Sequence, residues 1–522
     1  MARSRAFALV LLFCALSSSC HVAFSYPPVL APKEDFLACL VKEIPPRLLY
    51  AKSSPAYPTV LSATIRNSRW SSPQNVKPLY IVTPTNVSHI QSAVVCGRRH
   101  GVRIRVRSGG HDYEGLSYRS ERAESFAVVD LNMMRAVSVD ANARTAWVES
   151  GAQIGELYYA ISKASPSLAF PAGVCPSIGV GGHFSGGGFG MLLRKFGIAA
   201  ENVLDAKLVD ANGKLHDRKS MGEDHFWAIR GGGGESFGIV VGWEVKLLPV
   251  PPVVTVFKVS KTLKDGAIDI VNKWQTVAPA LPGDLMIRIL AMAQQATFEG
   301  MYLGTCNNLL PLITSKFPEL GFNRGQCNEM PWAQTIPFIH LGNRDLGDLT
   351  NRNNNFKPFA EYKSDYVYQP IPKNVWEQIF GWLTKPGAGI MIMDPYGATI
   401  SATPETATPF PHRKGVLFNI QYVNYWFAEG AGAAPLQWSK DMYKFMEPYV
   451  SKNPRQAYAN YRDIDLGRNE VVNDVSTYSS GKVWGEKYFK GNFQRLAMIK
   501  GKVDPEDYFR NEQSIPPLLT KY

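Results

Sequence analysis

The residues with the clearest chemical potential lie beside three glycine-rich segments of one region. His111 lies within Arg107-Ser-Gly-Gly-His-Asp-Tyr113, Cys175 shortly precedes Gly179-Val-Gly-Gly-His-Phe-Ser-Gly-Gly-Gly-Phe-Gly190, and the third segment is Arg230-Gly-Gly-Gly-Gly-Glu-Ser-Phe-Gly238. Glycine lets the backbone adopt positive φ and come close to a ligand, so successive N–H groups can face phosphate oxygens. Three such segments close together predict an extended ligand such as a dinucleotide.

The spacing of these glycines differs from the common nucleotide-binding motifs. In the pattern G-x-G-x-x-G, the sixth position is Phe184 when counted from Gly179 and Met191 when counted from Gly186. No segment matches G-x-x-x-x-G-K-[ST] or H-E-x-x-H. The sequence therefore indicates neither a Rossmann domain nor a P-loop, and it predicts no metal site.

The N-terminus has the pattern of a secretory signal. Arg3 and Arg5 precede the apolar run Ala6–Leu16, and Ala23-Phe-Ser25 supplies the small residues that signal peptidase requires. The run is too short to span a membrane, and no later segment approaches about 18 uninterrupted apolar residues. We therefore expect residues 1–25 to be removed and the mature protein to be secreted, extracellular or in the cell wall.

Secretion changes how the cysteines are counted. Two of the 7 cysteines fall within the signal, and the remaining five are Cys39, Cys96, Cys175, Cys306 and Cys327. An oxidising compartment favours disulfides, and an odd count leaves one sulfur for other chemistry. The position of Cys175 before a glycine-rich run identifies it as that sulfur. In the same compartment, the sequon Asn86-Val-Ser88 predicts N-glycosylation of Asn86.

The charge pattern argues against a nucleic-acid partner. Lys and Arg number 56 and Asp and Glu number 44, which gives a formal net charge of +12. The basic residues are scattered, and no basic run is interleaved with aromatic residues. We expect a small-molecule substrate, no nucleic acid, no membrane, and a monomer.

The elements that must position these residues predict an α+β protein. Short β-branched runs alternate with glycine clusters from about Lys77 to Pro249, as in Leu79–Thr83, Val102–Val106 and Ala127–Leu131. After the cluster Pro249-Val-Pro-Pro252, longer alternating runs such as Leu285–Leu290 and Val416–Trp426 flank helical stretches at 307–317 and 437–449. This pattern predicts an antiparallel sheet with helices on one face. We expect the last seventy or so residues to pack back onto the first domain, because they form no core of their own.

Several segments identify the chain as similar to the berberine bridge enzyme-like family. They are Val106-Arg-Ser-Gly-Gly-His-Asp-Tyr-Glu-Gly-Leu-Ser117, Cys175-Pro-Ser-Ile-Gly-Val-Gly-Gly-His183, Phe226–Ile239, Asn460–Gly467, and the tail from Trp484 to Pro517. Within that family the chain resembles the group 4 grass pollen allergens. The resemblance implies the vanillyl-alcohol-oxidase (PCMH-type) fold: an FAD-binding domain over 26–250 with its core at about 74–250, a substrate domain over 251–454, and a C-terminal segment over 455–522 that completes the FAD domain.

The resemblance also implies how FAD is held. It assigns His111 to the 8α link and Cys175 to the C6 link on the flavin, and an imidazole and a thiolate are nucleophiles able to add to that ring. It pairs Cys39 with Cys96, whereas a pairing of Cys306 with Cys327 stays open. The further cofactor-binding residues that it implies are Arg107, Ser108, Gly109, Gly110, Gly179, Gly181, Gly182, Gly238 and Ile239.

On the substrate side, the resemblance predicts oxidation of an alcohol, with hydride passing to flavin N5 while a base takes the hydroxyl proton. The active-site positions that it implies are Tyr113, Asn419, Gln421, Tyr458 and Tyr461. A period of two places Asn419, Gln421 and Tyr425 on one face of their strand. Because a tyrosine has a reference pKa of about 10 and is a poor base at neutral pH, the identity of the base stays open.

Three positions bear on the substrate and the electron acceptor. Family members that oxidise monolignols have Lys in place of Asn419 and Tyr in place of Phe189, so these departures favour a carbohydrate. A Val in place of Ile178 accompanies fast oxygen use in the family, so Ile178 predicts a dehydrogenase that uses another acceptor. The alternatives are a monolignol or alkaloid oxidase, and a cell-wall binding or defence protein with incidental turnover.

Overall fold

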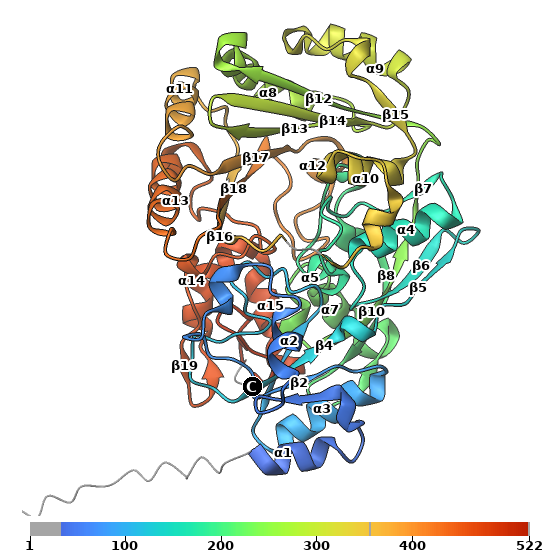
Figure 1. Ribbon diagram of the computed structural model, residues 1–522, viewed down its shortest axis with the longest axis vertical. Helices are drawn as coiled ribbons and strands as arrows, with labels where there is room; N and C mark the ends of the chain where they lie inside the picture. Colours follow the sequence, from blue (N-terminus) through green and yellow to red (C-terminus); the bar gives the residue numbers. More distant parts are fainter. Residues whose placement is uncertain (1–32, 354–355, 520–522) are drawn as a thin grey trace, which may run out of the picture.

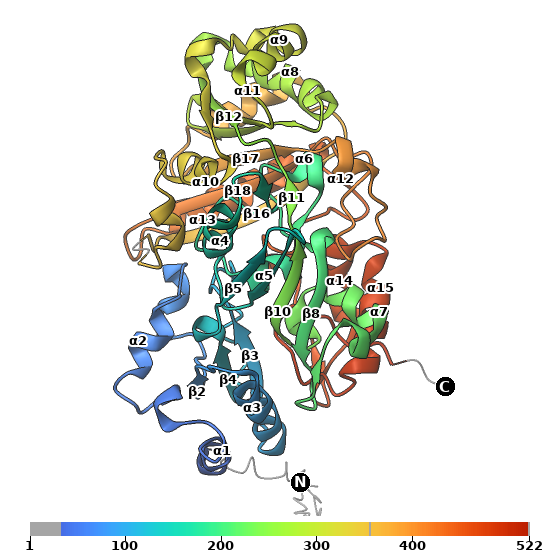
Figure 2. The ribbon, with the colours of Figure 1, turned by 90° about the vertical axis from the view of Figure 1, so that its right-hand side faces the viewer.

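The computed structural model describes residues 33–353 and 356–519. The expected signal segment 1–25 lies outside the described residues. Two small sheets and most of the helices form one end of the molecule, and a large sheet forms the other end (Figures 1 and 2). The cavity that concerns function lies between these two parts.

The first part contains a mixed sheet and an antiparallel sheet. The mixed sheet has the order β1 (Leu49–Ala51), β2 (Tyr80–Val82), β4 (Phe126–Asp130), β3 (Arg103–Arg107). The antiparallel sheet has the order β5 (Val137–Asp140), β6 (Thr145–Glu149), β10 (Ile239–Lys246), β8 (Val203–Val209), β9 (Leu215–His216). Strands β2, β3 and β4 cover the three β-branched runs of the sequence, and β3 and β4 pair in parallel. The expected strands are thus confirmed, and β3 delivers the loop that carries His111.

The helices of the first part cover its sheets, and one of them, α5, lies within the second glycine-rich segment. They are α1 (Lys33–Leu40), α2 (Tyr57–Ser62), α3 (Val87–Arg99), α4 (Ile154–Ala164), α5 (Val180–Ser185), α6 (Leu193–Phe196) and α7 (Arg218–Ile229). The short α5 follows Cys175 and contains Gly181 and Gly182. Strands β7 (Leu168–Ala169) and β11 (Leu248–Pro249) pair beside the domain border.

The second part is a seven-stranded sheet in which neighbouring strands pair antiparallel. Its order is β15 (Asn328–Met330), β12 (Val254–Thr262), β14 (Gln295–Tyr302), β13 (Leu285–Met292), β17 (Ile390–Pro395), β18 (Phe418–Trp426), β16 (Phe359–Val367). Helices α8 (Ala267–Ala280), α9 (Cys306–Lys316), α11 (Lys373–Trp382) and α13 (Ala433–Met446) bury one face of it in a single apolar core. The expected antiparallel sheet with helices on one face is confirmed, and the other face is free to line a cavity.

The last segment returns to the first part. Helices α14 (Tyr478–Phe489) and α15 (Asn492–Val503) contribute Trp484 and Phe493 to the same core as Phe226 of α7. The Glu512 carboxylate lies 3.2 Å from the Arg105 guanidinium of β3, and both are buried. The remaining elements are α10 (Trp332–Leu341), α12 (Ala398–Ala402), β19 (Val471–Val472) and β20 (Val475–Ser476).

The cysteines divide as the secretory interpretation expects. Cys39 pairs with Cys96, and Cys306 pairs with Cys327. Within the described part of the chain, Cys175 is the free cysteine. Asn86 is exposed and caps α3 by accepting a hydrogen bond from the His89 backbone N–H; its glycosylation stays a prediction.

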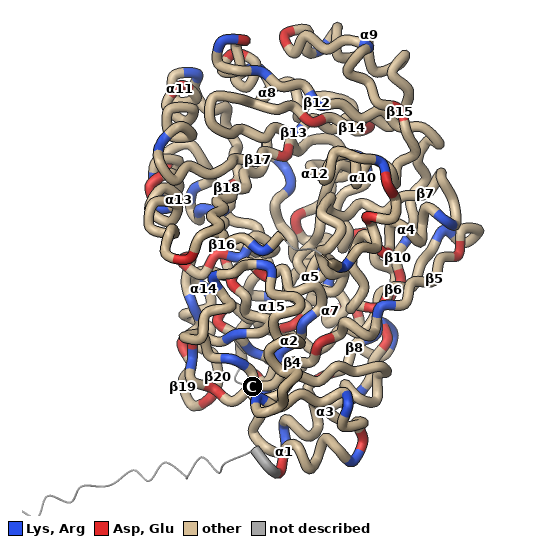
Figure 3. Tube along the Cα trace, in the orientation of Figure 1, with Lys and Arg blue, Asp and Glu red and all other residues tan. Residues whose placement is uncertain are grey.

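No helix in the described ranges is long and apolar enough to cross a membrane. Lys and Arg are spread over both parts of the fold and are interspersed with Asp and Glu (Figure 3). The distribution matches the scattered basic residues of the sequence.

One buried carboxylate at the junction with the last segment makes stability depend on pH. Glu114 is 6% exposed and accepts a hydrogen bond from the Ile464 N–H, and burial together with Glu361 and Asp463 raises the pKa of Glu114 to about 8. At pH values between the ordinary pKa of 4.5 and about 8, the Glu114 carboxyl group stays protonated in the folded protein but is ionised in the unfolded chain. Its stabilising contribution is therefore complete below pH 4.5 and is lost as pH rises through 8.

We expect Glu114→Gln to keep the hydrogen bond to Ile464 and to remove this pH dependence. The variant's melting temperature then falls less than that of the wild type between pH 5 and pH 8, and at pH 8 the variant is more stable by on the order of 1 kcal/mol or more. Thermal unfolding at four pH values measures this, with the exposed Glu429→Gln as control. Parallel curves for Glu114→Gln and the wild type are the opposing result.

Candidate functional site

One large cavity lies between the two parts of the molecule. Its volume is about 1140 Å³, above the range of about 300–1,000 Å³ for ordinary small-molecule pockets. The walls come from all three glycine-rich segments, the open face of the seven-stranded sheet and the returning C-terminal segment. The volume leaves room for both a large cofactor and a substrate.

The glycines of two loops meet where a cofactor backbone could lie. A Cβ on Gly109 would come within 2.3 Å of the Gly179 nitrogen, and one on Gly179 would come within 2.2 Å of the Gly109 nitrogen. A Cβ on Gly182 would meet nothing within 4 Å, although Gly182 lines the cavity. The first two glycines permit the loops to touch, and Gly182 leaves open space that a ligand can fill. This cradle fits FAD.

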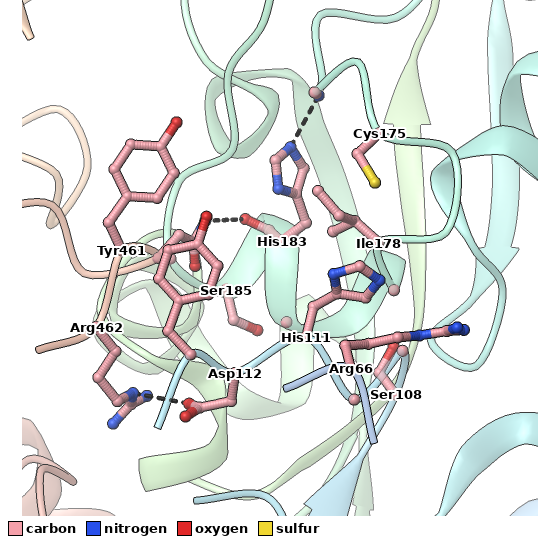
Figure 4. A pocket seen from close by; sticks show the side chains of 18 of the residues that line it. Arg66, Ser108, His111, Asp112, Cys175, Ile178, His183, Ser185, Tyr461 and Arg462 are labelled. Carbon is pink, nitrogen blue, oxygen red and sulfur yellow. Dashed lines mark hydrogen bonds and ion pairs between the residues drawn. The ribbon is translucent and has the colours of Figure 1, made fainter. Parts of the chain in front are cut away.

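His111 and Cys175 reach the cavity from different loops and share one neighbour. The Ser177 Oγ lies 3.0 Å from His111 Nε2 and 3.4 Å from Cys175 Sγ. Figure 4 shows both side chains directed into the same space. Two nucleophiles that are 64 positions apart in the sequence are therefore held beside a single hydroxyl.

Both nucleophiles have pKa values suited to attack. Burial is the main cause that lowers the pKa of His111, to about 3, so its imidazole is neutral. Burial alone would raise the pKa of the Cys175 thiol, but hydrogen bonds from His340 and Ser177 outweigh this effect and lower it. The neutral imidazole and the thiolate are the reactive forms of the two groups.

Ile178 lies on the same wall, three residues after Cys175. Its side chain is half-buried and lines the cavity, while its backbone oxygen accepts a hydrogen bond from the Ile154 N–H. His183, on α5, accepts a hydrogen bond from the Gly173 N–H at 3.0 Å, and burial lowers its pKa to about 4. The backbone contacts fix this wall independently of the Ile178 side chain.

Most of the residues expected to bind the cofactor line the cavity. They are Ser108, Gly109, Gly110, His111, Cys175, Gly179, Gly181, Gly182 and Gly238. Arg107 and Ile239 do not line it. The Arg107 guanidinium is fully buried and pairs with Asp130 at 2.6 Å, and it also donates to the Leu61 and Val60 carbonyls. Arg107 thus holds the loop of His111 from behind.

The C-terminal return closes the cavity. Arg462 forms an ion pair with Asp112 at 2.8 Å (Figure 4) and a second one with Glu235 at 2.7 Å, so it joins the first and third glycine-rich segments. A segment far along the chain therefore holds the residue next to His111.

A group of aromatic side chains lines another part of the cavity. The Tyr113 ring stacks on Tyr362 with centroids 3.6 Å apart, and its centroid is 5.8 Å from that of Tyr461. The Gln421 side chain donates to the Tyr113 hydroxyl at 2.6 Å. The structure thus brings together three of the five expected active-site residues: Tyr113, Gln421 and Tyr461.

Tyr458 lies beside this group. Its hydroxyl accepts hydrogen bonds from the Gly188 N–H at 2.8 Å and from Asn460 at 2.9 Å, and its ring packs against Phe189. Burial raises the pKa values of Tyr113, Tyr458 and Tyr461. A buried tyrosine with a raised pKa is a weak base, because its phenolate is scarce at neutral pH.

Asn419 lies on the same strand face as Gln421 but does not line the cavity. It is fully buried, and its amide nitrogen donates to the Asp365 carbonyl at 3.1 Å. A neutral amide stands where the monolignol-oxidising relatives are expected to have a lysine.

The sequence reasoning missed a row of charged side chains on the open face of the large sheet. Arg288 of β13, Glu299 of β14 and Asp394 of β17 line the cavity. The Arg288 Nε and Nη2 atoms donate to Glu299 at 2.9 and 2.7 Å. A signal existed, because a single charged residue interrupts each of the apolar runs Leu285–Leu290 and Ile390–Pro395. A buried charge in an apolar strand needs a partner or a function.

The chain was compared with known proteins. A family model for the FAD binding domain matches residues 78–218, and a model described as berberine and berberine like matches residues 457–516. The berberine bridge enzyme-like protein Cyn d 4 of Cynodon dactylon is 71% identical in an alignment of 522 positions. The alignment covers 99% of this chain and all of that protein. The monolignol oxidoreductase AtBBE-like 13 of Arabidopsis thaliana is 42% identical in an alignment of 540 positions, which covers 99% of each protein.

The solved structures agree with the sequence comparison. The crystal structure of Phl p 4, described as a grass pollen allergen with glucose dehydrogenase activity, matches with a TM-score of 0.93 and 81% identity. It covers 93% of this chain and all of that one. A Phl p 4 variant with one isoleucine replaced by valine, described as a glucose oxidase, matches with the same score, identity and coverage.

Proposed function

The chain belongs to the berberine bridge enzyme-like family of FAD-dependent oxidoreductases, and from this premise we propose that it is a secreted carbohydrate dehydrogenase. FAD is joined through His111 and Cys175. The observation that carries the substrate class is the polar floor of the cavity, where Arg288, Asp394 and Gln421 line one face of the large sheet. A substrate with many hydroxyl groups can form hydrogen bonds with these polar side chains, whereas an aromatic alcohol would leave several of the side chains without partners.

The chain's own residues bind and orient the substrate. FAD, when bound, supplies a two-electron acceptor whose N5 takes hydride from the carbon that bears the hydroxyl group. The Gln421 amide fixes the Tyr113 hydroxyl, and the stacked Tyr362 holds the Tyr113 ring. The C-terminal return lines the cavity and is held in place by the ion pairs of Arg462 with Asp112 and Glu235.

The likeness to Phl p 4 supports the choice of a sugar, and Asn419 and Phe189 argue against monolignols. Neither residue supplies the cation or the phenol of the monolignol-oxidising relatives. For secretion, the N-terminal pattern and the two disulfides are the support, because disulfides persist in oxidising compartments. Ile178 supports an acceptor other than oxygen.

Anaerobic reduction of the bound flavin tests the proposal. The purified holoprotein is mixed separately with D-glucose, cellobiose and a monolignol, and bleaching of the flavin absorption is followed. We expect a sugar to reduce the flavin and the monolignol to reduce it at least about tenfold more slowly, a difference of about 1.4 kcal/mol in the barrier. Faster reduction by the monolignol rejects the sugar assignment, and no reduction by any alcohol favours a binding or defence protein.

A further inference from the structure

The base of the reaction is unassigned, and the cavity floor contains a carboxylate that nothing else in the structure uses. Asp394 lies at the end of β17 that faces the cavity and is 4% exposed. Within residues 33–353 and 356–519, no group forms a hydrogen bond with its carboxylate. A buried carboxylate without a hydrogen bond is costly, so its retention calls for a function.

The register of the sheet shows what surrounds Asp394. Lys258, Glu299, Arg288, Asp394 and Asn419 follow one another across five adjacent strands. Glu299 is opposite both Lys258 and Arg288, and Asp394 is opposite Asn419. Arg288 and Asp394 are the next residues along β13 and β17 after the pair Ile289–Met393, so they lie beside each other. Directly opposite residues project from the same face of a sheet. The row therefore projects from one face of the sheet, and its three central members, Arg288, Glu299 and Asp394, line the cavity.

The charges in this row are unevenly satisfied. Glu299 takes both of its cations, with Lys258 Nζ at 2.9 Å on one oxygen and the Arg288 guanidinium at 2.7 Å on the other. Asp394 is left with the electrostatic attraction of Arg288 and the repulsion of Glu299. Its other charged or titratable neighbours are Tyr461 on the C-terminal return and Tyr396 after β17. One carboxylate is thus engaged as a structural ion pair, and the other is left for a ligand.

We propose that Asp394 is the residue that accepts the hydroxyl proton of the substrate, and that Arg288 orients the oxygen that loses this proton. The inference rests on the proposed oxidation of an alcohol. The O–H bond breaks and its proton goes to the Asp394 carboxylate. The C–H bond breaks with both electrons, which pass as hydride to FAD, and the carbon–oxygen bond becomes a carbonyl. The substrate loses two electrons and FAD gains them.

The competing candidates fit this role less well. Burial raises the pKa values of Tyr458 and Tyr461, so both phenols stay protonated at neutral pH. The pKa of Asp394 is also raised, mainly by burial, while Arg288 opposes the shift. A raised pKa makes a carboxylate a stronger proton acceptor than an ordinary aspartate. Asn419, the cross-strand neighbour, is neutral and leaves the carboxylate without a second cation.

The test compares Asp394→Asn, Asp394→Glu and wild-type holoenzyme in anaerobic reduction, with whichever alcohol reduces the wild-type flavin fastest. We expect Asp394→Asn to slow reduction by about 10²–10⁴-fold, the usual contribution of a positioned base, and Asp394→Glu to restore part of the rate. The wild-type rate falls as the carboxylate is protonated at low pH, and Asp394→Asn lacks this decrease. Arg288→Gln moves the decrease to higher pH, because the cation no longer favours the ionised form.

Two further measurements separate catalysis from structure. The melting temperature of Asp394→Asn stays within about 3 °C of the wild type or rises, because no hydrogen bond is lost and a buried charge is removed. Binding of D-glucono-1,5-lactone, followed by the flavin spectrum, is retained. Asp269→Asn, the same change at an exposed aspartate of α8 that does not line the cavity, is the control and is expected to alter the rate less than about twofold.

The outcomes distinguish the inference from the function on which it rests. A sugar that reduces the wild type and Asp394→Asn equally fast overturns the role of Asp394 and leaves the sugar dehydrogenase standing. A large loss of melting temperature in Asp394→Asn assigns Asp394 to structure and also overturns its role. If a monolignol is the fastest reductant and Asp394→Asn abolishes its reaction, Asp394 is supported as the proton acceptor and a sugar is rejected as the substrate. No reduction of the wild type by any alcohol rejects both.

Discussion

Replacing both His111 and Cys175 with alanine is expected to release all of the flavin into the supernatant when the protein is precipitated with acid. The wild type and each single variant should keep a yellow pellet, because one remaining covalent bond suffices to hold the flavin. The two side chains approach the same space from different loops and share Ser177 as neighbour. This geometry allows both bonds to form on one flavin ring.

The absorption of pellet and supernatant measures the effect for the wild type, the two single variants and the double variant. His100→Ala is the control for loss of a histidine, since His100 does not line the cavity. A single variant that releases all of its flavin shows that only one link exists. A double variant with a yellow pellet shows that some other residue is attached.

The second large effect concerns oxygen. Ile178→Val should convert the protein from a dehydrogenase into an oxidase, because loss of one methyl group opens space beside the flavin-binding wall. Removing a steric barrier of about 2.7 kcal/mol raises a rate about a hundredfold. The Ile→Val change costs only about 0.5–1.5 kcal/mol even in a full core, and Ile178 is half-buried. The glucose oxidase description of the Phl p 4 isoleucine-to-valine variant agrees in direction.

The measurement is the rate at which sugar-reduced holoenzyme is reoxidised in air-saturated buffer. Ile392→Val is the matched control, because Ile392 is also a half-buried isoleucine of the cavity wall but lies on the large sheet. Reduction by the sugar should be unchanged in both variants. An equal gain in Ile392→Val, or no gain in Ile178→Val, contradicts a specific oxygen gate at residue 178.

The parts of the fold set by local pattern could be predicted from the sequence. The β-branched runs became β2, β3 and β4, and the helical stretch at 307–317 became α9, within one residue at each end. The odd cysteine count predicted one unpaired sulfur from compartment and number alone, and the adjacent glycine-rich run identified it as Cys175. Alternation along one strand is local, and it placed Gln421 and Tyr425 on one strand face, from which both line the cavity.

The parts that depend on distant register could not be predicted. Arg288 and Asp394 come from strands more than 100 residues apart in the sequence, and they become neighbours only when β13 pairs with β17. The family resemblance implied Arg107 as a cofactor-binding residue, yet Asp130 of the neighbouring strand pairs with its guanidinium. Asn419 has the right face, but a contact with the Asp365 carbonyl turns its amide away from the cavity. In each case the deciding partner belongs to another strand.

The most direct test is the mass of the flavin-bearing peptides of the wild-type protein. The disulfides are reduced, the protein is digested with trypsin, and the digest is then quenched with acid. Cleavage after Arg107 and Arg119 isolates residues 108–119 with His111, and cleavage after Lys163 and Arg194 isolates residues 164–194 with Cys175. We expect a single species in which one flavin joins both peptides. Free flavin with both peptides at their unmodified masses, or a flavin on only one of them, would contradict it.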